Sequence, residues 1–170
     1  MDTISFKKIP ISSYKYVYDI SINGTLLRDL MDWCYSDQNK ESPPGVFVAG
    51  FNSSMVTYSQ IKDKQTLMLI KKHWEHVFDN LLLNTPMYAD SKRQPLIVCS
   101  ECADIGCGMI TAVIEATENE IIWKDFAYQT NSDELQDKDV LKLIGPFSFE
   151  KQDYEAKLLN LKDTIIKNEP

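Results

Sequence analysis

Three closely spaced cysteines are the residues of this chain whose types and spacing come nearest to metal chemistry. Cys99, Cys102 and Cys107 lie in the segment CSECADIGCG, where the C-x-x-C pair could hold a zinc ion from a tight turn. A structural zinc site takes four ligands, and no spacing dictates whether Cys34, Asp104 or a histidine would be the fourth. We therefore expect no bound metal and no other cofactor, with the cysteines packing as small apolar residues in a turn between two strands.

The two histidines do not complete a catalytic arrangement. His73 and His76 lie three positions apart in HWEH, whereas metalloprotease chemistry needs two histidines four apart on one helix face. The chain also lacks a G-x-S-x-G nucleophile elbow, a phosphate-binding G-x-x-x-x-G-K loop and a G-x-G-x-x-G fingerprint. We therefore expect no catalytic residues and no enzymatic activity.

The charge balance favours a basic protein partner. The net charge is -7 and the sequence pI is about 4.8, which gives no attraction to nucleic acid phosphates or to an anionic membrane surface. A basic protein would instead be attracted and steered. Our candidates for contacts with such a partner are four acidic residues of the polar stretch TNSDELQDKD that have no evident structural role: Asp133, Glu134, Asp137 and Asp139.

The size and composition predict one globular domain over residues 1–170, with 44% hydrophobic and 25% charged residues. The N-terminal segment MDTISFKKIPISSYKYVYDI lacks the features of a signal peptide, and no apolar run is long enough to cross a bilayer. We therefore expect a cytoplasmic protein whose four cysteines stay reduced.

Strands are predicted where apolar residues alternate with polar ones or form a short run: residues 14–22, 95–100, 109–116 and 120–129. The last two flank a polar turn, which is typical of an antiparallel hairpin. Strict alternation along 120–129 would place Trp123 and Phe126 on opposite faces of the sheet. GVFVAGF is expected to form a short strand, and LIGPFSF an edge strand because Pro146 cannot donate to a ladder.

Apolar residues at helical spacing predict three helices. The longest spans about residues 63–83, with a stripe made of Leu67, Ile70, Trp74, Val77, Phe78 and Leu81. A second follows the Asn23-Gly24 turn, where Thr25 would cap a helix with one apolar side made of Leu26, Leu30 and Trp33. The C-terminal helix would bury Tyr154, Leu158, Leu161 and Ile165.

Together these elements predict an α+β fold. Its mostly antiparallel sheet would contain the central hairpin and pack against the long amphipathic helix and the C-terminal helix.

Residues 96–128 resemble a family of small bacterial proteins that have a C-x-x-C-x-D-x-G-C-G turn between strands, then a valine-rich strand, then a V/I-W-x-D-F-x-Y strand. The matching positions are Cys99, Cys102, Asp104, Gly106, Cys107, Gly108, Thr111, Trp123, Asp125, Phe126 and Tyr128. Further matches are Gly145, Pro146, Phe147, Phe149 and Tyr154, and more loosely Asn23, Gly24, Leu26 and Leu30. Ala103 lies where the family usually has glycine, and residues 40–90 match poorly. This resemblance implies a shared fold and no particular activity.

In overall character the chain is also similar to the immunity proteins of contact-dependent growth-inhibition and other polymorphic toxin systems. Those proteins bind a secreted toxin domain, often a basic nuclease, and block it. The resemblance implies a protein that covers the active site or substrate groove of a cognate bacterial ribonuclease toxin, through the acidic cluster or through residues 40–90. The alternative is a zinc-binding or metal-dependent protein built on Cys99, Cys102 and Cys107.

Overall fold

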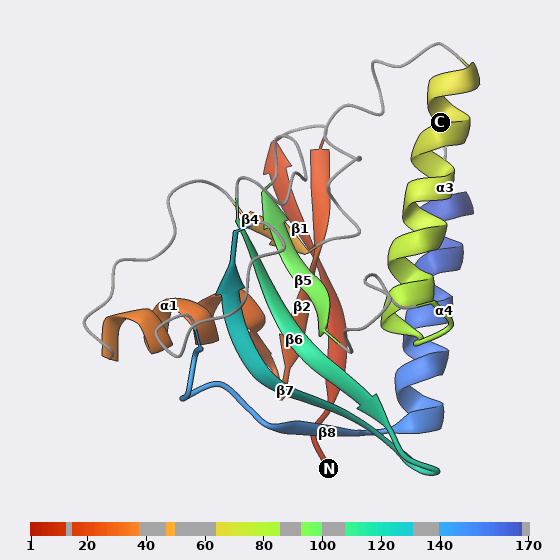
Figure 1. Ribbon diagram of the computed structural model, residues 1–170. Coiled ribbons are helices and arrows are strands. Elements are labelled where there is room, and N and C mark those ends of the chain that lie inside the picture. Colours follow the sequence, from red (N-terminus) through yellow and green to blue (C-terminus); the bar gives the residue numbers. More distant parts are fainter. Residues whose placement is uncertain are drawn as a thin grey trace.

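The computed structural model describes residues 1–12, 15–37, 47–49, 64–85, 93–99, 108–130 and 140–167. These residues form two antiparallel sheets and helices at α1 (Leu27–Asp37), α3 (Lys64–Leu81) and α4 (Lys151–Lys167) (Figure 1). The smaller sheet contains β1 (Ile4–Ser12), β2 (Lys15–Ile22) and β3 (Thr25–Leu26). The larger sheet contains, in spatial order, β4 (Phe47–Ala49), β5 (Arg93–Cys99), β6 (Met109–Ala116), β7 (Glu120–Gln129) and β8 (Phe147–Glu150). The fold is of the α+β class, as the sequence predicts.

The larger sheet confirms the predicted hairpin. β6 and β7 pair from Met109 opposite Gln129 to Ala116 opposite Ile121, with the bounds that the sequence pattern gives. Every neighbouring pair in this sheet is antiparallel, and β4 and β8 are its two edges. The expected short strand is therefore present as β4. The expected edge strand is present only in part, because β8 begins at Phe147 and leaves residues 143–146, with Pro146, outside the strand.

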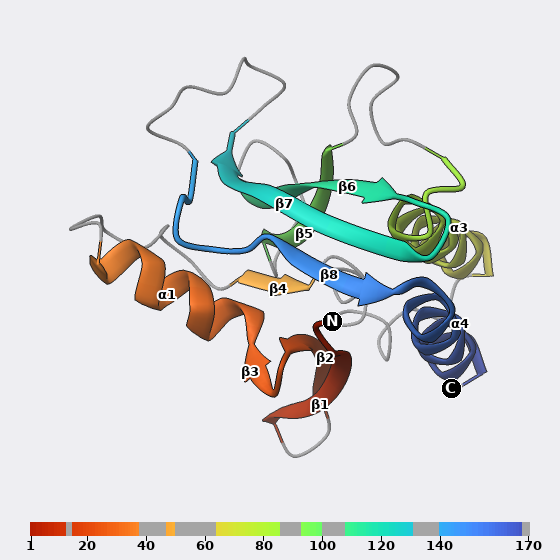
Figure 2. The ribbon, with the colours of Figure 1, turned by 90° about the horizontal axis from the view of Figure 1, so that it is seen from below.

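Helices α3 and α4 run side by side along one side of the larger sheet, while α1 lies on the other side of the molecule (Figures 1 and 2). The C-terminal part of α3 contributes Val77, Phe78 and Leu81 to the core. The side chains of Leu67, Ile70 and Trp74 lie outside the described residues, so the rest of the predicted stripe stays a prediction. Helix α4 buries the four residues predicted for it: Tyr154, Leu158, Leu161 and Ile165.

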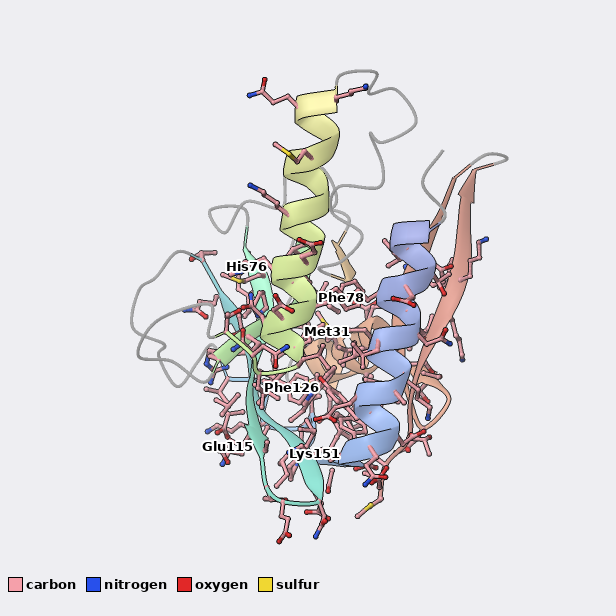
Figure 3. All side chains as sticks on the ribbon, turned by 90° about the vertical axis from the view of Figure 1, so that its right-hand side faces the viewer. Met31, His76, Phe78, Glu115, Phe126 and Lys151 are labelled. Carbon is pink, nitrogen blue, oxygen red and sulfur yellow. The ribbon has the colours of Figure 1, made fainter. Side chains whose placement is uncertain are left out.

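One core joins the two sheets and the helices. Phe78 of α3, Phe126 of β7 and Met31 of α1 all belong to this cluster of buried residues (Figure 3). Strand β1 was not predicted, and it pairs with β2 along most of its length. The alternation along residues 14–22 implies an exposed polar face that includes Asp19 and Ser21. This expectation is wrong, because both are buried, as is Ile20 between them.

The prediction for α1 is wrong in its orientation. Thr25 and Leu26 pair with β2 as strand β3, so the helix begins one residue later than the pattern indicated. The buried side consists of Leu27, Met31, Cys34 and Tyr35. This stripe is rotated by about 100° from the predicted one, which is the angle between successive helical residues. Trp33 consequently points outward and is 57% exposed.

The expectation that Trp123 and Phe126 lie on opposite faces is also wrong. β7 contains a bulge, in which Asp125 and Phe126 together lie opposite Ala112 of β6. Asp125 adopts a φ of 52°, and this returns Phe126 to the face that Trp123 occupies. Both side chains are buried in the same core, with the Phe126 ring 5.7 Å from the ring of Phe147.

Candidate partner-binding surface

The site residues predicted from the sequence lie mostly outside the described residues. This is true of the four acidic candidates, of Cys102 and Cys107, and of the side chain of Cys99. Residues 100–107 connect β5 to β6, which are antiparallel neighbours, so the cysteine segment does join two adjacent strands as predicted. Cys34, one candidate for a fourth ligand, lies in the hydrophobic core. Within the described ranges no three His, Cys, Asp or Glu side chains are grouped so that they could hold a metal.

Gly108 and Tyr128, both part of the first resemblance, form a close contact. Gly108 has a φ of 91°, and a Cβ there would overlap the ring and hydroxyl of Tyr128. Only glycine therefore fits where the chain enters β6. In this chain the contact therefore ties the glycine before β6 to the tyrosine of β7.

Other residues of the same resemblance also build the fold. The indole of Trp123 donates a hydrogen bond to the hydroxyl of Tyr154, and a Cβ at Gly145 would come within 3.0 Å of the Phe126 ring. In the described part of the chain these side chains therefore contribute to the packing of the core.

The Asn23-Gly24 turn joins the two sheets. Asn23 Oδ1 accepts a 2.8 Å hydrogen bond from the Thr3 amide, and its Nδ2 donates to Asp2 Oδ1 at 2.7 Å. The other Asp2 oxygen accepts a 2.8 Å bond from the Ser148 amide at the start of β8. These bonds lower the pKa of Asp2, first through Asn23 and then through Ser148. The turn residues are thus structural as well.

Arg93 supports the bulge of β7. Its Nη1 donates to the Asp125 carbonyl at 2.6 Å and to Thr111 Oγ1 at 3.2 Å. Burial lowers the pKa of Arg93, while the Asp125 carboxylate opposes that shift. Nearby, Lys124 and Glu115 form a 2.8 Å ion pair. These polar groups on the sheet are engaged with one another, and none is arranged as a nucleophile beside a base.

The outward side of α1 combines an exposed tryptophan with acidic residues. We call this surface the acidic α1 face, and it consists of Asp29, Asp32, Trp33, Ser36 and Asp37, all exposed. Their spacing places them on one side of the helix, opposite the buried stripe. Sequence reasoning missed this face because it assigned Trp33 to the apolar side. The competing stripe of four buried residues, from Leu27 to Tyr35, was the signal that could have revealed it.

The only basic residue of α1, Arg28, is engaged by the smaller sheet. Arg28 forms a 2.5 Å ion pair with Asp19 of β2, whose side chain is almost fully buried. Burial raises the pKa of Asp19, and the charge of Arg28 opposes that increase. The ion pair fixes the first turn of α1 against the smaller sheet. The outward orientation of Trp33 is therefore set by this pair together with the packing of the buried side of α1 against the core.

The end of α1 departs from the usual charge preference of helices. Asp37 lies in the last turn, which has no basic residue. The C-terminal end of a helix carries a partial negative charge, so a carboxylate there is unfavourable. Departures from such a local preference are expected at functional sites.

Searches against known protein families, curated proteins and solved structures gave no match. The resemblances found in the sequence therefore stay predictions. In the described part of the chain, none of the helices has the combination of length and apolarity that a bilayer span requires.

Proposed function

We propose that this protein is an immunity protein, without catalytic activity of its own, that neutralises a cognate ribonuclease toxin in the cytoplasm. It would bind the toxin domain and cover its active site or substrate groove. The observation that carries the proposal is the acidic α1 face, where Trp33 is exposed among Asp29, Asp32 and Asp37.

Charge complementarity connects this surface to a ribonuclease. A ribonuclease must present Lys and Arg side chains to hold phosphates, and an acidic protein can compete for the same surface. Opposite fields would also speed the encounter, which matters when the toxin has already entered the cell. The association rate should therefore fall as salt screens these charges.

Trp33 would supply the part of the affinity that does not depend on salt. Tryptophan is among the residues most often found to dominate binding energy, because it buries a large, rigid surface when the complex forms. An exposed tryptophan that the core does not use is thus suited to act as an anchor. The anchor would mainly slow dissociation, whereas the carboxylates would mainly speed association.

The proposal is tested in cells. Genes for immunity proteins lie directly downstream of the toxin gene, so the C-terminal domain encoded by the adjacent upstream gene is expressed with and without this protein. We expect growth only when the two are expressed together, and continued killing by a ribonuclease toxin from an unrelated pair. Equal killing with and without this protein, together with no complex in purified mixtures, would exclude the immunity function.

A further inference from the structure

The acidic α1 face has a symmetric arrangement around its tryptophan. Asp29 lies four residues before Trp33 and Asp37 four residues after it, so the indole has a carboxylate one turn away in each direction. Ser36 is exposed beside them and adds a hydroxyl group. A group seated on the indole would therefore meet an acceptor on both sides along the helix axis.

The chemistry of this face excludes several kinds of occupant. An apolar segment would cover Trp33 but would also bury the carboxylates without partners, which is costly. A second copy of this face would bring like charges together, and a nucleic acid would bring phosphates against aspartates. A cationic segment is the occupant that satisfies both the aromatic surface and the acceptors.

Arginine fits this arrangement better than lysine. A guanidinium is planar, stacks on an aromatic face and keeps its N–H donors in the plane, where they reach carboxylates beside the ring. An ammonium is a compact and strongly hydrated charge, so it loses more on leaving water. The single arginine of α1 cannot occupy this place because Arg28 is held by Asp19.

We infer that the acidic α1 face binds an arginine-rich segment of the partner, with one guanidinium stacked on Trp33 and hydrogen-bonded to Asp29 or Asp37. This inference rests on the proposed function, and it names the chemistry of the contact. Arginine side chains also form bidentate hydrogen bonds with phosphates. Occupying them at this face would remove them from the toxin's RNA-binding surface.

The inference is tested with two synthetic peptides of equal length and charge, one rich in arginine and one rich in lysine, titrated calorimetrically into the intact protein. We expect tighter binding of the arginine peptide. Trp33→Ala should weaken that binding about two- to five-fold and remove the preference over lysine, as expected for an exposed cation–π contact. Since Trp33 is exposed, the thermal unfolding curve should not change, which separates loss of binding from loss of folding.

A matched pair of double variants tests whether peptide binding depends on the acidic α1 face or only on the net charge of the protein. Asp29→Asn/Asp37→Asn removes two carboxylates beside Trp33, and Glu118→Gln/Glu155→Gln removes two from the β6–β7 turn and α4, on the other side of the molecule (Figure 1). The first double variant should bind the arginine peptide more weakly than the second. Equal weakening by both, or equal affinity of the normal protein for the two peptides, overturns the inference.

The two proposals can fail separately. If the toxin is neutralised normally by the Asp29→Asn/Asp37→Asn and Trp33→Ala variants, the α1 contact is wrong and the immunity function remains. If the peptides behave as expected but no toxin is neutralised, the inference that the acidic α1 face binds arginine stands and the proposed immunity function is wrong.

Discussion

The indole nitrogen of Trp123 donates a hydrogen bond to the hydroxyl oxygen of Tyr154 at 3.3 Å, and that hydroxyl donates to the carbonyl of Leu81 at 3.0 Å. The chain of bonds links β7, α4 and the C-terminal end of α3. Burial raises the pKa of Tyr154, so the phenol stays protonated and remains a donor. The two rings also meet edge to face, with centroids 5.9 Å apart.

Replacing Tyr154 by phenylalanine should destabilise the protein without affecting partner binding. The change leaves the Trp123 N–H and the Leu81 carbonyl without their partner, which costs about 1–3 kcal/mol of unfolding free energy for a buried group. Leu159→Ala, on the exposed side of the same helix, should change stability by less than about 0.5 kcal/mol. Urea denaturation compares the two variants, and equal midpoints would contradict the buried hydrogen-bond chain.

Gly108→Ala should be more damaging than Gly24→Ala. Both glycines have positive φ, at 91° and 86°, so both substitutions carry the same kind of backbone strain. Only at Gly108 does the added methyl group also collide with Tyr128, whereas nothing lies within 4 Å of a Cβ at Gly24. Backbone strain alone costs about 1–3 kcal/mol, and the collision should add to that cost. Thermal melting that ranks Gly24→Ala as the more destabilised variant would contradict this explanation of the motif.

The hydrogen bonds that Asp2 accepts from Asn23 and Ser148 predict a loss of stability in acid. The pKa of Asp2 is lowered from 3.8 in the folded protein, so its contribution is fully present above that value and is lost as the pH falls through the lower, folded pKa. Asp2→Asn should flatten this part of the stability profile, and Glu118→Gln, a change at an exposed turn residue, should leave it unaltered. Unfolding free energies measured between neutral pH and strong acid test this prediction. If the slope of unfolding free energy against pH in Asp2→Asn equals that of the normal protein, the prediction is contradicted.

The contribution of Asp19 to stability should change with pH in the direction opposite to that of Asp2. Its pKa is raised, so its contribution is present below 3.8 and is lost as the pH rises through the higher, folded pKa. The pH dependence of the unfolding free energy of the normal protein contains the contributions of both carboxylates. Each contribution must therefore be measured with its own asparagine variant.

Local patterns predicted much of this fold, and the errors arose where one residue changed a register. The β6–β7 hairpin and the buried side of α4 follow from alternation and helical spacing within short segments. The same alternation failed at Asp125, because a bulge depends on one residue adopting positive φ and on the partner strand. For α1, two stripes with the same spacing compete, and the pairing of Thr25 and Leu26 with β2 decides between them.

The candidate site could not be predicted for a related reason. The sequence directed attention to cysteines and to a cluster of acidic residues, since these are conspicuous in type. Trp33 became a candidate only after the packing of α1 showed that the core does not need it. The proposal of a basic partner could be made from the sequence, because net charge is a property of composition and not of register.

The cysteine segment provides a separate prediction about metal. We expect the purified protein to contain no stoichiometric zinc, since the sequence offers three clustered thiolates and no defined fourth ligand. Elemental analysis of protein purified without chelators measures this directly. Near-stoichiometric zinc that disappears in Cys102→Ser would instead favour the metal-binding alternative.

The central claim is that this protein binds and blocks a ribonuclease toxin, and inhibition of RNA cleavage tests it most directly. The purified toxin domain encoded by the upstream gene is incubated with a fluorogenic RNA while this protein is added in increasing amounts. We predict that cleavage stops near one equivalent and that Trp33→Ala requires a larger amount at the same toxin concentration. Undiminished cleavage in the presence of excess protein would contradict the account.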